Sequence, residues 1–358
     1  MSAEPARVKR LRTELIEREL DALLVTNLHN VRYLSGFTGT NGTLVLSASS
    51  AILLTDFRYT VQAADQAEYF EIVDGGTEPR KKLIEALDGA TAVGFDDADM
   101  RVKSHAGLVK EMPEGISLEP ASGVVEAIRA VKDDHEIDAI ARAAMIADSI
   151  YVSLANEGLV GRTERDVAWR IEELARDGGA SGLSFPSIVA GGAHAALPHA
   201  EPRDVAIEAG QLVVLDLGVI HGGYCSDCTR TFATGPIPDS ARAAYELVLD
   251  AQQKSLAGVL VGAECKEVDA LARDLITADG MGDNFGHSLG HGVGIEVHEL
   301  PTLSSRSDGQ LVAGNIVTVE PGVYVEGEFG VRIEDLVVVS SDGPRVLTPF
   351  TKELVTVD

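Results

Sequence analysis

The stretch LVVLDLGVIHGGYCSDCTRTF, residues 212–232, decides the fold of the C-terminal part of this chain. Two runs with the residue pattern of β-strands flank a short glycine-containing turn, which predicts a hairpin. If His221 and Gly222 form its two-residue loop, the numbers of opposed residues sum to 443. Asp216 and Asp227 then lie directly opposite each other among apolar neighbours. Like charges placed there are destabilising, and a bound cation would resolve the conflict.

The same construction recurs in VTVEPGVYVEGEFGVRIEDLVVV, residues 317–339. A turn at Glu326–Glu328 makes the numbers of opposed residues sum to 654, which pairs Glu320 with Glu334. The dipeptide Pro321-Gly322 favours a bulge beside this pair. The sequence therefore predicts two hairpins that each present two opposed carboxylates within apolar strands.

A glycine-rich segment with three histidines, GHSLGHGVGIEVHELP at residues 286–301, separates the two hairpins. Glycine lets the backbone come close to a site, and four carboxylates with one imidazole suit cations such as Mn²⁺, Co²⁺, Fe²⁺ or Zn²⁺. Taken singly, each residue has an ordinary explanation as a turn aspartate, a solvated glutamate or a structural histidine. Taken together, they favour a site for two metal ions, which activate water and hold a tetrahedral intermediate.

The composition indicates a globular protein of about two domains, since the chain has 358 residues, 45% of them hydrophobic and 24% charged. Lys and Arg number 30 against 56 Asp and Glu, a net charge of −26. Electrostatics therefore argue against nucleic acid or an anionic membrane as a partner. The basic residues comprise 9 Lys and 21 Arg. An acid-rich, Lys-poor chain suggests a halophilic source, where salt screens the repulsion between carboxylates.

No apolar run approaches the length of a membrane span, and the charged first residues do not resemble a signal peptide. Three cysteines give no disulfide framework. We therefore expect a cytoplasmic protein. The pair Cys225-x-x-Cys228 is better explained by strand packing than by a redox or zinc site, because residues three apart in a strand face opposite sides.

Alternating strand and helix patterns predict an α/β domain over residues 1–126. From Val124 to Ile150, apolar residues recur at helical spacing without Gly or Pro, which predicts one or two long helices and a domain boundary. Residues 127–358 form the second predicted domain, of mixed α and β structure. There, Thr163 followed by Asp166 predicts a helix start at Glu164.

The two hairpins and the histidine segment resemble the pita-bread dinuclear metallopeptidases. The matching motifs are Asp216-Leu-Gly, Gly-Tyr-Cys-Ser-Asp227, GHGVG with His291, VEPG with Glu320, and VRIED with Glu334. They look like the Xaa-Pro branch, which contains prolidase and aminopeptidase P. NVRYLSGFTGTNG (residues 30–42) and TDFRYTVQAADQ (55–66) are similar to the N-terminal domain of that branch. The resemblance covers nearly the whole chain, and implies a creatinase-like N-terminal domain followed by a pita-bread catalytic domain.

The resemblance implies a ligand set of five residues for two divalent ions in each subunit, with Mn²⁺ as the first expectation. Asp216 would bind one metal, and Asp227 and Glu334 would bridge both. His291 and Glu320 would complete the other metal. A water or hydroxide that bridges the metals would attack the scissile carbonyl.

The resemblance also implies catalytic roles outside the ligand set. Glu320 would take the proton of the water and pass it toward the leaving amine. His199 and His298 match two additional histidines that would polarise the carbonyl or hydrogen-bond the intermediate. Tyr324 and Arg332 match a pair that supports the ligands in aminopeptidase P relatives.

A peptide bond before proline has no N–H, so an enzyme for it needs a small pocket for the ring and no reliance on that donor. The candidate walls of this pocket are Phe185, His194, His199 and His287. For Phe185 and His194, an ordinary structural role has equal weight.

The activity implied by the resemblance is that of a homodimeric metallo-exopeptidase, a hydrolase that cleaves Xaa-Pro bonds at the N-terminus of short proline-containing peptides. Relatives of the dipeptidase type often carry Arg after HExP, where this chain has Thr302. This difference favours an aminopeptidase that accepts longer peptides, and dipeptidase activity stays open because other basic residues can hold a carboxylate.

Two alternatives keep the fold and change the function. One is a creatinase-like hydrolase or lyase that acts on a small non-peptide solute. The other is a non-enzymatic binding protein, as in some eukaryotic relatives. Both groups are expected to lose metal ligands, whereas all five are present here. The intact set favours metal-dependent peptidase chemistry.

Overall fold

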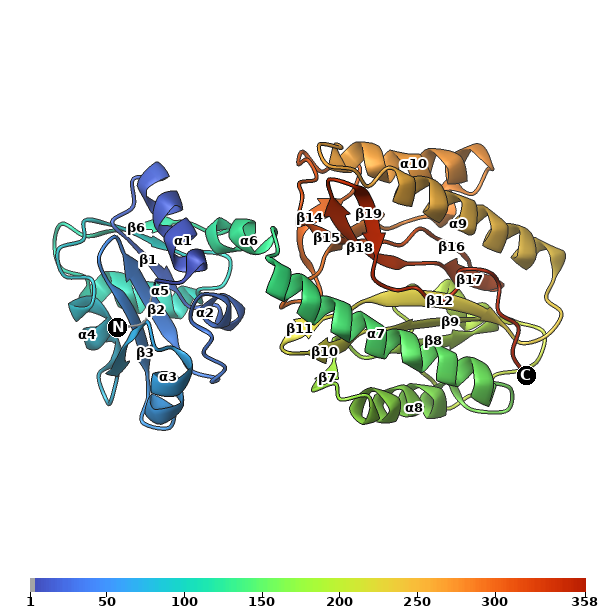
Figure 1. Cartoon of the computed structure of the whole chain (residues 1–358), viewed down its shortest axis with the longest axis horizontal. Coiled ribbons are helices and arrows are strands. Elements are labelled where there is room, and N and C mark those ends of the chain that lie inside the picture. Colours follow the sequence, from blue (N-terminus) through green and yellow to red (C-terminus); the bar gives the residue numbers. More distant parts are fainter. Residues whose placement is uncertain (1–3) are drawn as a thin grey trace. The chain divides into compact units, whose positions relative to one another are not determined.

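The computed structural model describes residues 4–358. The chain forms two compact units, one that ends at Arg129 and one that runs from Ala130 to Asp358. Both combine helices with sheets, as the predicted fold class requires (Figure 1). The predicted domain boundary between residues 126 and 127 stays a prediction.

The N-terminal unit is built on one six-stranded sheet with the strand order β4-β3-β2-β1-β5-β6. Its strands are β1 (Ala22–Val25), β2 (Thr43–Ser47), β3 (Ala51–Thr55), β4 (Glu71–Asp74), β5 (Ala92–Phe95) and β6 (Ser117–Pro120). Strand β2 is antiparallel to both of its neighbours, β1 and β3, whereas the pairs β1–β5, β5–β6 and β3–β4 are parallel. Five strands therefore run in one direction and β2 runs in the other. The carboxyl ends of these five strands therefore share one edge of the sheet.

The described part of this unit contains six helices: α1 (Ala6–Glu17), α2 (Leu28–Ser35), α3 (Thr60–Gln66), α4 (Pro79–Glu85), α5 (Val102–Glu111) and α6 (Val124–Arg129). The sequence patterns did not predict α2 and α5. The side chain of Asn27 caps α2 by accepting hydrogen bonds from the N–H groups of His29 and Asn30, and Gly36, with φ of 80°, ends the helix. Both caps were visible in the sequence.

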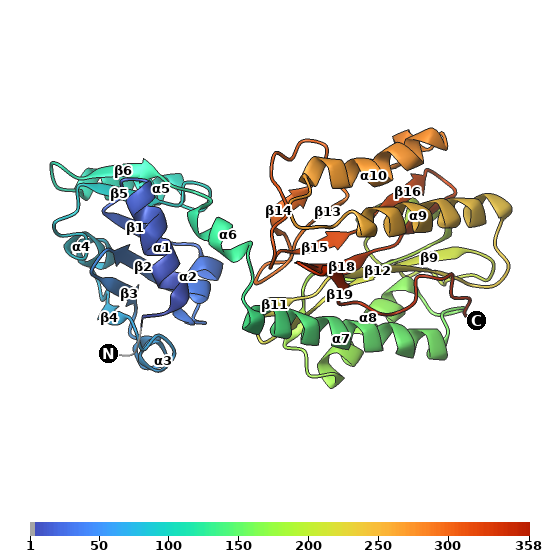
Figure 2. The same cartoon turned by 45° about the horizontal axis from the view of Figure 1, so that its top comes forward.

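In the C-terminal unit, α7 (Asp134–Glu157) and α8 (Glu164–Asp177) lie on one side of the strands, and α9 (Asp239–Ala257) and α10 (Cys265–Ala278) lie on the other (Figure 2). The predicted start of α8 is confirmed, because Thr163 and Asp166 form a reciprocal capping box. Apolar side chains of each helix pair pack against strands in a buried core.

The strands between these helices form four small sheets with the orders β11-β10-β7, β12-β9-β8, β14-β13-β15-β18-β19 and β16-β17. Their bounds are β7 (Gly182–Leu183), β8 (Ile188–Gly191), β9 (Leu212–Leu217), β10 (Val219–His221), β11 (Tyr224–Cys225), β12 (Cys228–Ala233), β13 (Gly290–Gly292), β14 (Glu299–Leu303), β15 (Ile316–Val319), β16 (Gly322–Val325), β17 (Phe329–Arg332), β18 (Asp335–Ser340) and β19 (Gly343–Val346). None of the helices in the described part of the chain has the length and apolarity of a membrane span.

The register predicted for the first hairpin is wrong. Opposed residues in β10–β11 and in β9–β12 have numbers that sum to 445, so Asp216 lies opposite Thr229 and not opposite Asp227. The two-residue loop is Gly222-Gly223, with φ of 60° and 85°. A tight hairpin turn of this kind needs positive φ at both central residues, which glycine adopts freely and histidine does not.

The register predicted for the second hairpin is confirmed. Pairs in β16–β17 and in β15–β18 both sum to 654, as in Val323 with Val331 and Thr318 with Leu336. Glu320 and Glu334 lie between these two ladders, next to the break at Pro321. The register is therefore the same in both ladders, and the two glutamates lie in the gap between them, where neither belongs to a strand.

Candidate metal centre

Three of the predicted metal ligands converge in the C-terminal unit. Asp227, His291 and Glu334 each offer a ligand atom, and these atoms all lie within 4.8 Å of one another. Asp227 follows β11, His291 is the central residue of β13, and Glu334 precedes β18. The site therefore joins strands from the first hairpin, the glycine-rich segment and the second hairpin.

Glycines on both sides of His291 allow its strand to pack this closely. A Cβ atom at Gly290 would overlap the carbonyl oxygen of Thr318, and one at Gly292 would overlap that of Leu300. The backbone of His291 is also fixed, because its N–H donates a hydrogen bond to Thr318 Oγ1 at 3.0 Å. The GHG sequence thus brings the imidazole to the centre between two neighbouring strands.

The other two predicted ligands, Asp216 and Glu320, lie at the same centre. The His291 Nε2 atom is 3.2 Å from Glu320 Oε1 and 3.7 Å from Asp227 Oδ2. The charges of Asp216 and Glu320 both raise the pKa of Asp227, after the larger effect of burial and the charge of Glu334. The structure therefore brings all five predicted ligands into one electrostatic cluster.

The four carboxylates differ in how well the protein compensates them. Burial raises the pKa of Asp216, and the Arg332 guanidinium, 2.7 Å from its Oδ2 atom, opposes that shift. Burial also disfavours ionised Glu320, but the His291 hydrogen bond and neighbouring positive charges outweigh it and lower its pKa. For Asp227 and Glu334, burial and the other carboxylates hold the pKa well above its usual range.

Two buried acceptors of this cluster, Asp216 Oδ1 and Glu334 Oε1, have no hydrogen-bond partner among residues 4–358. Buried acceptors and unpaired buried charges are costly, so they are normally satisfied by donors or by cations. An oxygen-rich set with one imidazole fits divalent ions such as Mn²⁺, Fe²⁺, Co²⁺ or Zn²⁺. The residues present therefore fit the metal centre predicted from the sequence.

Arg332 connects several groups behind the ligands. Its Nη1 donates to the Tyr324 hydroxyl at 2.7 Å, and its Nε donates to Thr229 Oγ1 at 3.0 Å. Thr229 in turn donates to Glu334 Oε2 at 2.7 Å, and the Tyr324 hydroxyl lies 3.0 Å from His287 Nε2. Arg332, Tyr324 and His287 were predicted near the centre, whereas Thr229 was missed. The correct register would have found it, since Thr229 lies opposite Asp216.

Arg230 is a second residue that the sequence reasoning missed. It is fully buried, donates to Asp335 Oδ1 at 2.9 Å, and also donates to the backbone carbonyl of Glu334. Asp335 is further held by Gln252 and Lys352. Because successive residues of a strand face opposite sides, Thr229 and Glu334 reach the metal centre while Arg230 and Asp335 bind each other behind it.

His298 and His199 lie beside the ligands. The ring centroids of His298 and His291 are 4.4 Å apart. Burial lowers the pKa of His298, and the charges of His291 and His199 lower it further. Both histidines nevertheless keep part of their surface open to solvent, so they can meet a bound substrate.

The candidate pocket walls have different surroundings. Phe185 lies against Gly218 of the first hairpin, where a Cβ would come within 3.0 Å of its ring. His194 Nδ1 lies 3.0 Å from Glu164 Oε2, and this buried carboxylate also pairs with Arg203 at 2.9 Å. His194 therefore has a structural partner that ties the loop before His199 to α8.

Comparison with known proteins identifies the family. The model of metallopeptidase family M24 matches residues 135–341, and that of the creatinase/prolidase N-terminal domain matches residues 7–131. The chain belongs to metallopeptidase family M24. The fold is accordingly a creatinase-type N-terminal domain followed by the M24 pita-bread domain, as predicted.

Relatives within M24 match over almost their full length. An Xaa-Pro dipeptidase of Pyrococcus horikoshii is 33% identical over 98% of each chain. The structure of an Xaa-Pro dipeptidase from Bacillus anthracis is 40% identical and superposes with a TM-score of 0.95, covering 98% of this chain and 99% of the other. An X-Pro aminopeptidase from Thermotoga maritima is 33% identical, with a TM-score of 0.89 over 98% of this chain and 100% of the other.

Proposed function

We propose that this M24 protein is a metal-dependent exopeptidase that hydrolyses the Xaa-Pro bond at the N-terminus of short peptides. The observation that carries the proposal is the buried cluster of four carboxylates and His291, with unpartnered acceptors on Asp216 and Glu334. The names of the full-length relatives, which include Xaa-Pro dipeptidases and an X-Pro aminopeptidase, support the substrate class.

The proposed ligands for two divalent ions are Asp216, Asp227, His291, Glu320 and Glu334. When bound, the ions supply Lewis acidity that activates a water and polarises the scissile carbonyl. The chain fixes the ligands before any ion arrives, because Arg332 holds Asp216 and Thr229 holds Glu334. Such preorganisation reduces the reorganisation needed at the moment of reaction.

The proton transfers are assigned to side chains of the chain. The lowered pKa of Glu320 keeps it ionised at neutral pH, so it can accept the proton of the attacking water and deliver it to the leaving proline nitrogen. Thr318 Oγ1 donates to Glu320 at 3.1 Å and helps to orient it. The lowered pKa of His298 keeps its ring neutral, and we assign to it and to His199 the hydrogen bonds to the carbonyl oxygen.

The test is hydrolysis of Ala-Pro and Ala-Pro-Ala by the Mn²⁺-reconstituted protein at low and high KCl, with Ala-Ala-Ala as the control. Cleavage of the tripeptide alone would identify an aminopeptidase, in agreement with Thr302. A preference for Ala-Pro would identify a dipeptidase in which another group holds the carboxylate. Cleavage of neither proline peptide by a protein with two bound metals would contradict the proposal and favour a small non-peptide solute.

Four finer features are proposed with this function. Manganese is the proposed metal, and a homodimer is the proposed assembly, both on the family resemblance. A salt-adapted source is proposed from the net charge of −26 and the small number of lysines. A cytoplasmic location is proposed because the three cysteines give no disulfide framework and no apolar run approaches the length of a membrane span. Metal analysis, solution scattering and the salt dependence of unfolding test the first three.

A further inference from the structure

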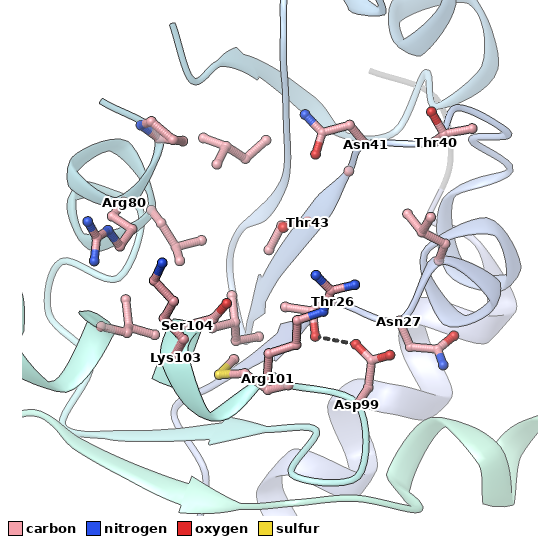
Figure 3. A pocket seen from close by; sticks show the side chains of 18 of the residues that line it. Thr26, Asn27, Thr40, Asn41, Thr43, Arg80, Asp99, Arg101, Lys103 and Ser104 are labelled. Carbon is pink, nitrogen blue, oxygen red and sulfur yellow. Dashed lines mark hydrogen bonds between the residues drawn. The ribbon is translucent and has the colours of Figure 1, made fainter. Parts of the chain in front are cut away.

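The N-terminal unit contains a cavity of about 830 Å³ that has no place in the proposed peptidase chemistry (Figure 3). It lies at the edge of the six-stranded sheet where the carboxyl ends of five strands meet. In open α/β sheets this edge is where ligands bind. The volume falls within the range of about 300–1,000 Å³ that is typical of small-molecule sites.

The floor of the cavity is apolar and its walls are polar. The floor includes four leucines that are less than 10% exposed, namely Leu24, Leu54, Leu83 and Leu108. Hydroxyl and amide groups line the walls above them: Thr26, Asn27, Thr40, Asn41, Thr43 and Ser104. An apolar base with a few polar groups is the composition of a site for an organic molecule, because burial supplies affinity and the polar groups fix its orientation.

The charge at this cavity is opposite in sign to that of the chain. Arg80, Arg101 and Lys103 line it, against one acidic residue, Asp99 (Figure 3). Asp99 Oδ2 accepts a hydrogen bond from Thr26 Oγ1 at 2.8 Å. In a chain with 30 basic and 56 acidic residues, three cations around one cavity form a local positive site. Such a site attracts anions.

Two of the three cations are available to a ligand. Arg80 pairs with Glu111 at 3.1 Å, and both side chains are about half exposed. Among residues 4–358, neither Arg101 nor Lys103 is engaged in an ion pair. Arg101 is also the N-cap residue of α5, and its side chain makes no capping hydrogen bond. The first turn of α5, which supplies Lys103 and Ser104, adds the positive end of a helix dipole to the same side of the cavity.

We propose that this cavity binds a small organic phosphate, with the apolar part of the molecule on the leucine floor and the phosphate between Arg101, Lys103 and the hydroxyl groups. A phosphate monoester carries close to two negative charges at neutral pH and offers three acceptor oxygens, which matches two cations outside ion pairs and the hydroxyl groups of Thr43 and Ser104. All of the lining residues belong to the unit that ends at Arg129. The proposal therefore does not depend on the peptidase assignment.

The test is calorimetric titration of the full-length, metal-loaded protein, freed of excess metal, with AMP and with glucose 6-phosphate. These two probes distinguish a nucleotide from a sugar phosphate. Inorganic phosphate and adenosine are the controls for the charged group and for the apolar body. We expect saturable binding of at least one organic phosphate, with an affinity at least about 10-fold above that of either control.

Variants locate the binding. The double variant Arg101→Ala/Lys103→Ala is expected to weaken binding by about 10-fold or more, since each removes a charge-assisted hydrogen bond. Lys110→Ala removes a cation from the same helix that does not line the cavity, and should change the affinity less than about twofold. Ser104→Trp narrows the cavity without changing charge and should also abolish binding. Asp227→Asn impairs the metal centre and should leave binding intact.

Three results would overturn the proposal. One is the absence of saturable binding of both organic phosphates. Another is equal weakening by Lys110→Ala and by the double variant, which would mean unspecific attraction. The third is loss of binding in Asp227→Asn, which would place the phosphate at the metal centre.

Discussion

The two hairpins that build the metal centre reach the same result in different ways. In the second, one register runs through β15–β18 and β16–β17, and Glu320 and Glu334 lie in the gap between the ladders. In the first, Asp216 stays within β9, while Asp227 lies outside the strands. Asp227, Glu320 and Glu334 thus reach the site from breaks in the ladders, whereas Asp216 reaches it from within a paired strand.

The hairpins also share an asymmetry. Each contributes one carboxylate that the protein compensates, Asp216 by Arg332 and Glu320 by His291. Each contributes one, Asp227 and Glu334, for which burial and neighbouring carboxylates outweigh the compensating groups and hold the pKa well above its usual range. The need for cations is therefore concentrated where the two hairpins meet.

The strongest test of this asymmetry removes the charge of Asp227 and that of Glu334, each in a separate variant. Asp227→Asn and Glu334→Gln should each lower kcat/KM for the better proline peptide by more than about 100-fold, the upper end of the loss expected for a group that only supports a ligand. Metal analysis should show fewer than two ions bound. Glu328→Gln, an exposed residue of the second hairpin, is the matched control. Activity within 10-fold of wild type in either ligand variant would contradict the assignment.

Metal removal and pH sharpen the comparison. Because burial and neighbouring carboxylates raise their pKa values, Asp227 and Glu334 keep their protons to a higher pH in the folded apoprotein than in the unfolded chain. Their contribution to apoprotein stability should therefore fall as pH rises above the ordinary carboxyl range of about 4. Bound metal removes this penalty and adds about 2.7 kcal/mol when free metal is 100 times the Kd. The increase in Tm on adding Mn²⁺ should be larger at pH 8 than at pH 5.

A variant supplies the control for this pH effect. Apo Glu334→Gln should be more stable than the apo wild type at pH 8, and the difference should shrink at pH 5. A difference that does not depend on pH would mean that ionisation of Glu334 is not the cause.

Thr229, in the first hairpin, contacts both Arg332 and Glu334 of the second hairpin, so a variant at this position tests whether the first hairpin orients the ligands of the second. Thr229→Val removes the hydroxyl that joins Arg332 Nε to Glu334 Oε2, and should lower kcat/KM by about 10- to 100-fold. Thr231 lies two residues along the same strand and bonds only the backbone of Arg332. Thr231→Val should therefore cost similar stability in urea unfolding but much less activity. Equal losses of activity would assign Thr229 a merely structural role.

The smallest effects are expected at the turns. Gly222 and Gly327 have φ of 60° and 77°, and neither has a close neighbour that a Cβ would overlap. Gly222→Ala and Gly327→Ala should each lower the free energy of unfolding by about 1–2 kcal/mol, from backbone strain alone. Urea titrations measure this loss, and kcat/KM should stay near the wild-type value. A large loss of activity in Gly222→Ala alone would show that the turn sets the position of Asp227.

The sequence pointed to the five proposed ligands through the combination of two carboxylate-bearing hairpins with a glycine-rich histidine segment, and through the family resemblance of these motifs, since each residue taken singly has an ordinary explanation. It also predicted the second register, because Glu326–Glu328 is the only turn between its strands. The first register failed although Gly222-Gly223 was the better turn, since only glycine adopts positive φ at both positions without strain. Thr229 was missed together with the first register, because only the correct pairing places it opposite Asp216. Arg230 was missed because its partner, Asp335, is 105 residues away and nothing local marks it.

The cavity of the N-terminal unit was out of reach for a related reason. It depends on strand ends and on α5, which the sequence analysis did not predict. Arg101 and Lys103 read as two ordinary surface cations in the sequence. Their proposed role in binding an anion follows only from the sheet edge, which brings them to the same cavity as the four leucines.

The joining of the two hairpins has a consequence for the cohesion of the chain. Arg332 and Asp216, which meet at this centre, are 116 residues apart. An ion held by ligands from both hairpins would act as a cross-link that closes a loop of that length. A covalent cross-link closing about 100 residues contributes about 4.7 kcal/mol in the chain-entropy model. Loss of the ions would then abolish activity and would also destabilise the C-terminal unit, because the cross-link between its two hairpins would be lost.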